Sequence, residues 1–184
     1  MPASDSPSTE ALGKLIDSIA QERRSPLFRP HVTLASLPDS VTIEQVAAAL
    51  LLEPPVPLAF DDICTGKTFY QSVFISMRPS FEILALRQRV HEKLGIEAKT
   101  PHFPHMSLYY GDTDREAIVD KLKEEGWVQN IDGGGVIVGA TSAVEAMEVW
   151  MMDCSGKPED WNMIMRVKLD VVGLMDIDER ALNG

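Results

Sequence analysis

Apolar residues recur every three or four positions in several stretches of the chain, a spacing that places them on one face of a helix. This spacing predicts four helices, over residues 10–24, 42–52, 81–94 and 114–125. Residue types at the ends agree with these boundaries, because Thr42 can cap the second helix and Gly95 can close the third. We therefore expect about four amphipathic helices.

Shorter runs rich in β-branched and aromatic residues, bounded by Pro or Gly, predict strands. These runs cover residues 31–36, 56–65, 67–77, 105–110, 136–141, 143–153 and 162–170. The second and third runs meet at Gly66, which predicts a hairpin turn there. Helices and strands interleave without a long linker, so we expect one α+β domain over residues 1–184.

Two of the predicted strands begin with nearly the same five residues, PHVTL at 30–34 and PHMSL at 104–108. Side chains alternate between the two faces of a strand. His31 and Thr33 would therefore share one face, as would His105 and Ser107, while the apolar residues between them anchor each strand in a core. Two such strands side by side would place two imidazoles and two hydroxyls around one small volume.

This set of side chains suits the hydrolysis of a phosphate ester without a metal or a cofactor. One imidazole can accept a proton from the attacking water and the other can donate one to the leaving alkoxide, because histidine titrates near neutral pH. The hydroxyls of Thr33 and Ser107 can donate hydrogen bonds to the non-bridging oxygens. The residues alone leave open which histidine is the base.

Four aromatic residues near these strands could stack on a nucleobase: Phe69, Tyr70, Tyr109 and Tyr110. Packing in the core or at its rim is the commoner role for any one of them. Strict alternation puts Tyr109 on the same face as His105 and Ser107, so we expect Tyr109 to line the cleft.

The remaining histidines invite other interpretations. His102 lies three residues before His105, and His-x-x-His suggests a metal site, but no Cys, Asp or Glu nearby completes a ligand set. We therefore expect a loop histidine and no metal. His91 lies in the helix predicted over residues 81–94, where we expect it to be solvated.

The net charge of −11 and the pI of about 4.7 argue against long nucleic acid as a partner, which requires a basic surface. A small anion can still be held by a few local donors. Two cysteines, Cys64 and Cys154, make no disulfide framework and favour a reduced compartment. With no signal-like start and no long apolar run, we expect a cytoplasmic monomer without a membrane span.

The paired His-x-Thr/Ser motifs resemble the signature of the two-histidine (2H) phosphoesterase superfamily. The segments PHVTLAS, TGKTFYQSVFISM, PHMSLYYGD and EVWMMDCSGKPEDW together resemble fungal 2',3'-cyclic-nucleotide 3'-phosphodiesterases, over residues 4–170. This resemblance implies a two-lobed α+β fold, with antiparallel sheets related by a pseudo-two-fold axis around a central cleft.

The same resemblance implies that His31 and His105 are catalytic, with His105 as base and His31 as acid, and that Thr33 and Ser107 bind the phosphate. It implies metal-free hydrolysis of 2',3'-cyclic nucleotides to 2'-phosphates. It also implies the opening of ADP-ribose 1'',2''-cyclic phosphate, a by-product of tRNA splicing, to ADP-ribose 1''-phosphate.

Some expectations depart from this resemblance or compete with it. Relatives usually carry a short apolar strand before the segment resembling PASDSP, and the chain starts at Met1 without it, which would leave a sheet edge uncovered. Golgi association, as in some fungal relatives, is an alternative to the cytoplasm. Two other functions stay open: an RNA-end-processing 2H enzyme (a 2',5'-ligase-like esterase or a uridine exonuclease), and a non-catalytic module that binds a nucleotide phosphate.

Overall fold

Helices and strands alternate along the chain in the computed structural model, which describes residues 6–97, 103–169 and 175–176. The helices are α1 (Pro7–Arg23), α2 (Ile43–Ala49), α3 (Phe81–Leu94), α4 (Arg115–Glu124) and the short 3-10 helix η1 (Pro158–Asp160). The strands are β1 (Val56–Thr68), β2 (Gln71–Met77), β3 (His105–Tyr109), β4 (Val128–Asn130), β5 (Val136–Val138), β6 (Ala143–Ala146), β7 (Glu148–Asp153), β8 (Asn162–Lys168) and β9 (Met175–Asp176). The predicted α+β class is confirmed.

The four helices lie where the apolar spacing predicts them, and local side-chain contacts fix their ends. At the start of α1, the Thr9 N–H donates to the hydroxyl of Ser6 at 3.2 Å. Thr42 and Gln45 form a reciprocal capping box at the start of α2. Gly95 ends α3 in the left-handed conformation, with a φ of 65° that favours glycine.

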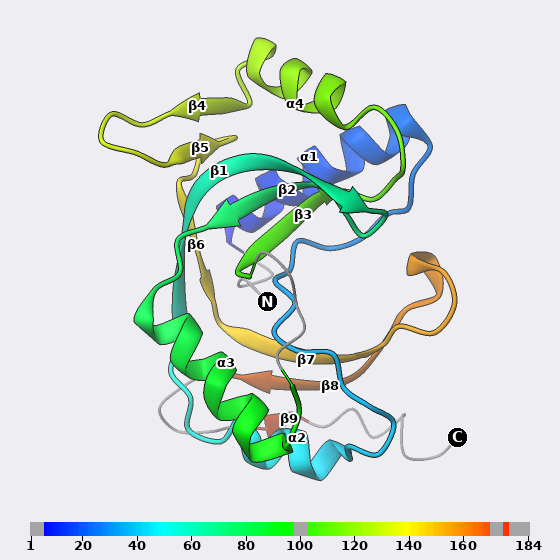
Figure 1. Ribbon diagram of the computed structural model, residues 1–184, viewed down its shortest axis with the longest axis vertical. Coiled ribbons are helices and arrows are strands. Elements are labelled where there is room, and N and C mark those ends of the chain that lie inside the picture. The colour runs from blue at the N-terminus through cyan, green and yellow to red at the C-terminus, as the bar shows by residue number, and fades with distance from the viewer. Residues whose placement is uncertain (1–5, 98–102, 170–174, 177–184) are drawn as a thin grey trace.

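The larger sheet has the strand order β3-β2-β1-β6, and all its pairs are antiparallel. Helix α1 packs on β3, and α4 packs on β1 and β2. Both helices lie in the upper half of Figure 1. Between the helices and the sheet lies a core that includes the fully buried side chains of Ile75 and Met106. The helices therefore cover one face of this sheet.

The second sheet has the order β7-β8-β9 and lies in the lower half of Figure 1, together with α2 and α3. The single strand predicted over residues 143–153 is wrong, because the chain leaves the first sheet at Ala146 and enters the second at Glu148. Only Met147 lies between, and its carbonyl accepts a hydrogen bond from the Leu169 N–H at 2.8 Å. The backbone stays extended across the change of sheet, so the residue pattern does not reveal it.

The hairpin between β1 and β2 also differs from the prediction, since the turn lies at Phe69 and Tyr70 rather than at Gly66. Gly66 lies inside β1, where a Cβ atom would come within 1.9 Å of the Gln71 carbonyl oxygen. This glycine is required by the close approach of two backbones and not by a turn.

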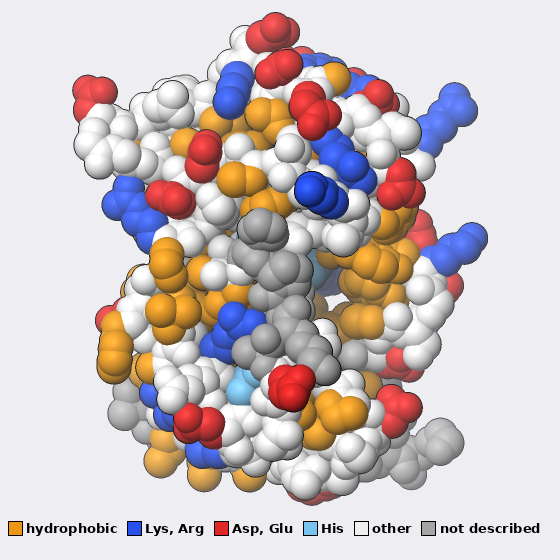
Figure 2. Space-filling view, in the orientation of Figure 1, with side chains coloured by type: hydrophobic (Ala, Val, Ile, Leu, Met, Phe, Trp, Pro, Cys, Tyr) orange, Lys and Arg blue, Asp and Glu red, His pale blue; other side chains and the backbone are white. Residues whose placement is uncertain are grey.

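The part with the larger sheet and the part with the second sheet meet at a narrower region of the molecule. The outline narrows between the upper and lower parts of the molecule, and apolar side chains gather on both sides of this narrowing (Figure 2). On the same face, Lys and Arg side chains are interspersed with Asp and Glu (Figure 2). No described helix is long and apolar enough to cross a bilayer. The pseudo-two-fold relation between the halves stays a prediction.

Candidate active site

The two His-x-Thr/Ser motifs lie side by side. Among the described residues, the strand predicted over residues 31–36 forms one ladder contact, an antiparallel bridge between Val32 and Met106. Antiparallel pairing about this bridge sets His31 opposite Ser107 and Thr33 opposite His105. Strand alternation about the bridge predicts that these four polar residues share one face and the two apolar centres the other. The structure thus brings the two motifs side by side at Val32 and Met106.

Strand β3 holds its half of the site inside the sheet. His105 pairs with Ser76 of β2, and the Phe74 ring meets the His105 ring edge-on at 5.3 Å. The Ser107 hydroxyl donates to the Tyr70 carbonyl at 2.9 Å. His105 and Ser107 are both buried. To bind a phosphate oxygen as a donor, Ser107 has to turn its hydrogen away from that carbonyl.

His31 is held through both ring nitrogens. Its Nδ1 lies 2.6 Å from the Arg29 carbonyl oxygen, which can only accept, so Nδ1 carries a hydrogen. Its Nε2 lies 3.3 Å from the Tyr110 hydroxyl, which donates to it when the imidazole is neutral. Burial lowers the pKa of His31 and raises the pKa of Tyr110. Both groups are therefore neutral at pH 7 in the unliganded site.

The expectation that Tyr109 lines the cleft is wrong, and a β-bulge is the reason. Ser107 pairs with Phe74 but Tyr109 pairs with Val73, so the register shifts by one residue between them. The shift puts Tyr109 on the face of Val73, where it is buried in the core under the helices. Tyr110 takes the place beside His31. Alternation in the sequence could not reveal this, because a bulge leaves no mark on the residue pattern.

Tyr110 is the centre of an aromatic cluster drawn from separate segments. Phe28 stacks on it with ring centroids 3.8 Å apart, and Tyr70 meets it edge-on at 5.4 Å. The Trp161 ring lies 6.2 Å away, and its buried indole N–H has no hydrogen-bond partner among the described residues. Tyr70 is 49% exposed. The cluster gives the site an aromatic wall that opens to solvent at Tyr70.

Arg29 connects the site to the second sheet. Its guanidinium lies over the Trp150 ring on β7, 5.6 Å from the ring centroid. The Trp150 indole N–H donates to Glu148 at 2.8 Å, and Glu148 is also paired with Arg166. The carbonyl that holds His31 therefore belongs to a residue whose side chain rests on β7. The exposed guanidinium also places a positive charge near the site.

His102 lies outside the described residues, so the structure does not test the His-x-x-His spacing. Among the residues that the structure describes, no three His, Cys, Asp or Glu side chains are grouped as metal ligands.

Comparison with known proteins agrees with this arrangement. The family model described as "Cyclic phosphodiesterase-like protein" matches residues 1–169. The chain belongs to this family. A curated relative, "Cyclic phosphodiesterase" from Arabidopsis thaliana, is 26% identical over 118 residues, which cover 61% of this chain and 64% of the relative. The family predicted from the two motifs is confirmed, whereas the fungal character of the quoted segments stays a prediction.

Proposed function

We propose that this protein hydrolyses 2',3'-cyclic nucleotides to nucleoside 2'-phosphates. The observation that carries the proposal is the antiparallel bridge between Val32 and Met106, the apolar centres of the two motifs, which supports a shared face for the two imidazoles and the two hydroxyls. Membership of the cyclic phosphodiesterase-like family supports it. ADP-ribose 1'',2''-cyclic phosphate, opened to the 1''-phosphate, is a second substrate in this proposal and would link the protein to tRNA splicing.

The proposed reaction needs two proton transfers, and the chain has a group for each. His105 accepts a proton from a water molecule as the water oxygen bonds to phosphorus. The bond from phosphorus to O3' breaks, and the Nε2–H of His31 donates its proton to O3'. The phosphate then remains on O2'. Thr33 and Ser107 donate hydrogen bonds to the non-bridging oxygens as negative charge develops there.

The charge of His31 depends on the substrate in this scheme. Burial keeps its pKa low in the unliganded site. An anionic phosphodiester next to the ring raises that pKa, because a nearby negative charge favours the imidazolium. The proton on Nε2 is therefore taken up with the substrate. When His31 is protonated, the Tyr110 oxygen accepts a hydrogen bond from Nε2–H, and it keeps this contact while the leaving oxygen approaches the same hydrogen.

The surroundings of the site favour a nucleotide over a long RNA. The aromatic wall of Phe28, Tyr70 and Tyr110 provides ring faces and edges for a base. Arg29 adds a positive charge for a phosphate. The chain as a whole is strongly acidic, with a net charge of −11, which disfavours a long polyanion. We place the protein in the cytoplasm as a monomer acting on small cyclic phosphates.

The test is hydrolysis of 2',3'-cyclic AMP in excess EDTA, with 2'-AMP and 3'-AMP resolved. We expect 2'-AMP, and EDTA should leave the rate unchanged because each proton transfer uses a side chain. Activity that EDTA abolishes, or 3'-AMP as the product, contradicts the proposal. Turnover of an oligonucleotide with a 2',3'-cyclic end at a much higher kcat/KM would point to RNA-end processing, and binding without turnover to a phosphate-binding module.

A further inference from the structure

The segment that leads into the first motif has few backbone contacts of its own. Among the described residues, the backbone of residues 26–30 forms no hydrogen bond with another backbone group, and Pro26 and Pro30 have no N–H to donate. The Arg29 carbonyl is nevertheless held 2.6 Å from Nδ1 of His31. Contacts made by the side chains of this segment therefore have to supply what ladder hydrogen bonds supply for the second motif.

One of these contacts joins the Arg29 side chain to the second sheet. The guanidinium lies 5.6 Å from the centroid of the Trp150 ring, a cation–π contact. Trp150 is half-buried on β7 and pairs with Arg166 of β8. Its indole N–H donates to the buried carboxylate of Glu148 at 2.8 Å, and that carboxylate is also paired with Arg166. Two strands and a hydrogen bond thus fix the ring on which Arg29 rests.

Pro30 couples the side chain of Arg29 to its carbonyl. A residue that precedes proline is confined to extended backbone, so Arg29 has little freedom to rotate its carbonyl independently of its side chain. If the guanidinium leaves Trp150, the two groups can move together. The carbonyl is the partner of Nδ1–H on His31, and such a partner decides which ring nitrogen carries the hydrogen. The contact on β7 therefore bears on the state of the His31 ring.

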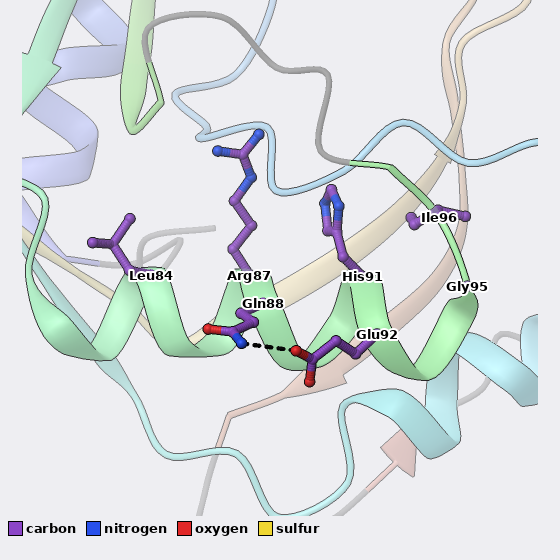
Figure 3. Close-up of a pocket in the computed structure, with 7 residues that line it drawn as sticks. All are labelled: Leu84, Arg87, Gln88, His91, Glu92, Gly95 and Ile96. Carbon is purple, nitrogen blue, oxygen red and sulfur yellow. Dashed lines mark hydrogen bonds between the residues drawn. The ribbon is translucent and has the colours of Figure 1, made fainter.

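A second contact holds the same segment on the far side of the motif. The expectation that His91 is solvated is wrong, because only 7% of the residue is exposed. Its ring projects from α3 (Figure 3), and Nε2 lies 3.4 Å from the Leu34 carbonyl. That oxygen can only accept, so Nε2 carries a hydrogen. Elements of the lower half of Figure 1 thus contact the segment both before and after His31 in the sequence.

We propose that Trp150 is a positioning residue for His31. By holding the Arg29 side chain, Trp150 keeps the Arg29 carbonyl in place to accept from Nδ1–H. Nε2 is then the nitrogen that takes up the proton and delivers it to the leaving oxygen. This role rests on the proposed function, in which His31 is the acid, but the state of the ring can be measured without turnover.

The first experiment measures the tautomer of His31 in the unliganded, full-length ¹⁵N-labelled protein at pH 8, with His31→Gln to assign the ring signals. We expect the Nδ1–H form in the wild type. Trp150→Leu should populate the Nε2–H form and bring the two nitrogen shifts closer together. Trp127→Leu, the same change at another half-buried tryptophan, should leave them unchanged.

Two further variants make this measurement independent of how well Trp150→Leu folds. Trp150→Phe keeps a ring face for the guanidinium and should restore most of the wild-type tautomer. Arg29→Met changes an exposed side chain and removes the other partner of the contact. It should shift the tautomer as much as Trp150→Leu does.

The second experiment measures the hydrolysis of 2',3'-cyclic AMP. Trp150→Leu should lower kcat roughly three- to fivefold, the size expected from the loss of a cation–π contact, and should change KM less than twofold. Because Trp150 acts through Arg29, the double variant Arg29→Met/Trp150→Leu should have the kcat of Arg29→Met alone. Trp127→Leu should change kcat less than 1.5-fold.

Three results would overturn the inference. They are an Nε2–H form of His31 in the wild type, a tautomer that neither Trp150→Leu nor Arg29→Met changes, and a shift in Trp127→Leu as large as that in Trp150→Leu. Additive losses of kcat in the double variant would also contradict it, since Trp150 would then act without Arg29. If the wild type does not turn over, the proposed function fails, and the tautomer measurement still decides the positioning role.

Discussion

The two motifs have almost the same sequence, yet the fold holds them in different ways. His105 lies in β3, paired along its length with β2 and buried in the sheet. His31 lies in a segment with a single bridge to that strand and is held by side-chain and carbonyl contacts from Arg29 and Tyr110. Ladder hydrogen bonds thus position one histidine, whereas one backbone carbonyl and one tyrosine hydroxyl position the other.

The largest expected effect comes from removing either imidazole. His31→Ala and His105→Ala should each lower kcat/KM for 2',3'-cyclic AMP by roughly 10² to 10⁴-fold, since general acid–base catalysis contributes this much. Because the two residues act in one step, the double variant should be little worse than the poorer single variant. Steady-state kinetics with thermal unfolding as the folding control test this. A binder without activity would lose affinity only.

A change of leaving group separates the roles of the two histidines. On a nucleoside phosphodiester that releases 4-nitrophenolate, the leaving group needs no proton. The loss of kcat/KM caused by His31→Ala should therefore be about 10²-fold smaller on this substrate than on 2',3'-cyclic AMP. His105→Ala should recover nothing, because the water still needs a base. Recovery in His105→Ala alone would reverse the assignment of acid and base.

A smaller effect is expected from the contact that holds His31. Tyr110→Phe removes the hydroxyl 3.3 Å from Nε2 and keeps the ring that stacks on Phe28. We expect kcat to fall about tenfold, in line with the loss of about 1.4 kcal/mol for a hydrogen bond to a group that becomes charged. Tyr109→Phe, the same change in the next residue, serves as the control and should alter kcat less than twofold. Equal effects would show that the bulge does not separate the two tyrosines.

The smallest effect is on stability and follows from the pKa of His31, which burial lowers below about 6.5. Between that folded-state pKa and 6.5, the unfolded chain binds more protons than the folded chain. The free energy of unfolding therefore falls as the pH is lowered through this window. Above about pH 6.5 the imidazole is neutral in both the folded and the unfolded chain, so this loss of stability is absent. Urea denaturation from pH 8 to pH 5 should show a steeper loss in wild type than in His31→Asn. Parallel curves would contradict a neutral His31 in the folded protein.

Much of this comparison could be predicted from residues alone, because it depends on short-range patterns. The His-x-Thr/Ser spacing predicted a shared polar face, and the bridge at Val32 and Met106 has that geometry. The helix ends at Thr42 and Gly95 could also be predicted, because each is fixed by residues next to it in the sequence. What could not be predicted depends on partners distant in sequence. The register of β3 against β2 decides which tyrosine meets His31.

The same reason explains the burial of His91 and the break at Met147. A histidine between Val90 and Glu92 on an amphipathic helix has the pattern of a surface residue, and the segment carrying Leu34 covers it from another part of the chain. The chain from Ala143 to Asp153 stays extended while its hydrogen-bond partner changes from β1 to β8. A pattern of side chains records which residues can form a strand and not which sheet receives it.

The single-residue joint at Met147 also limits how this protein can vary in length. One inserted residue would either shift β7 along β8 or turn each of its side chains to the opposite face, because the strand repeat is two. Trp150 would then no longer lie beneath Arg29, and the carbonyl that orients His31 would lose its support from the second sheet. Loops elsewhere can lengthen at little cost in free energy. The length of the connection at Met147, in contrast, sets the register of β7 and through it the orientation of the His31 ring.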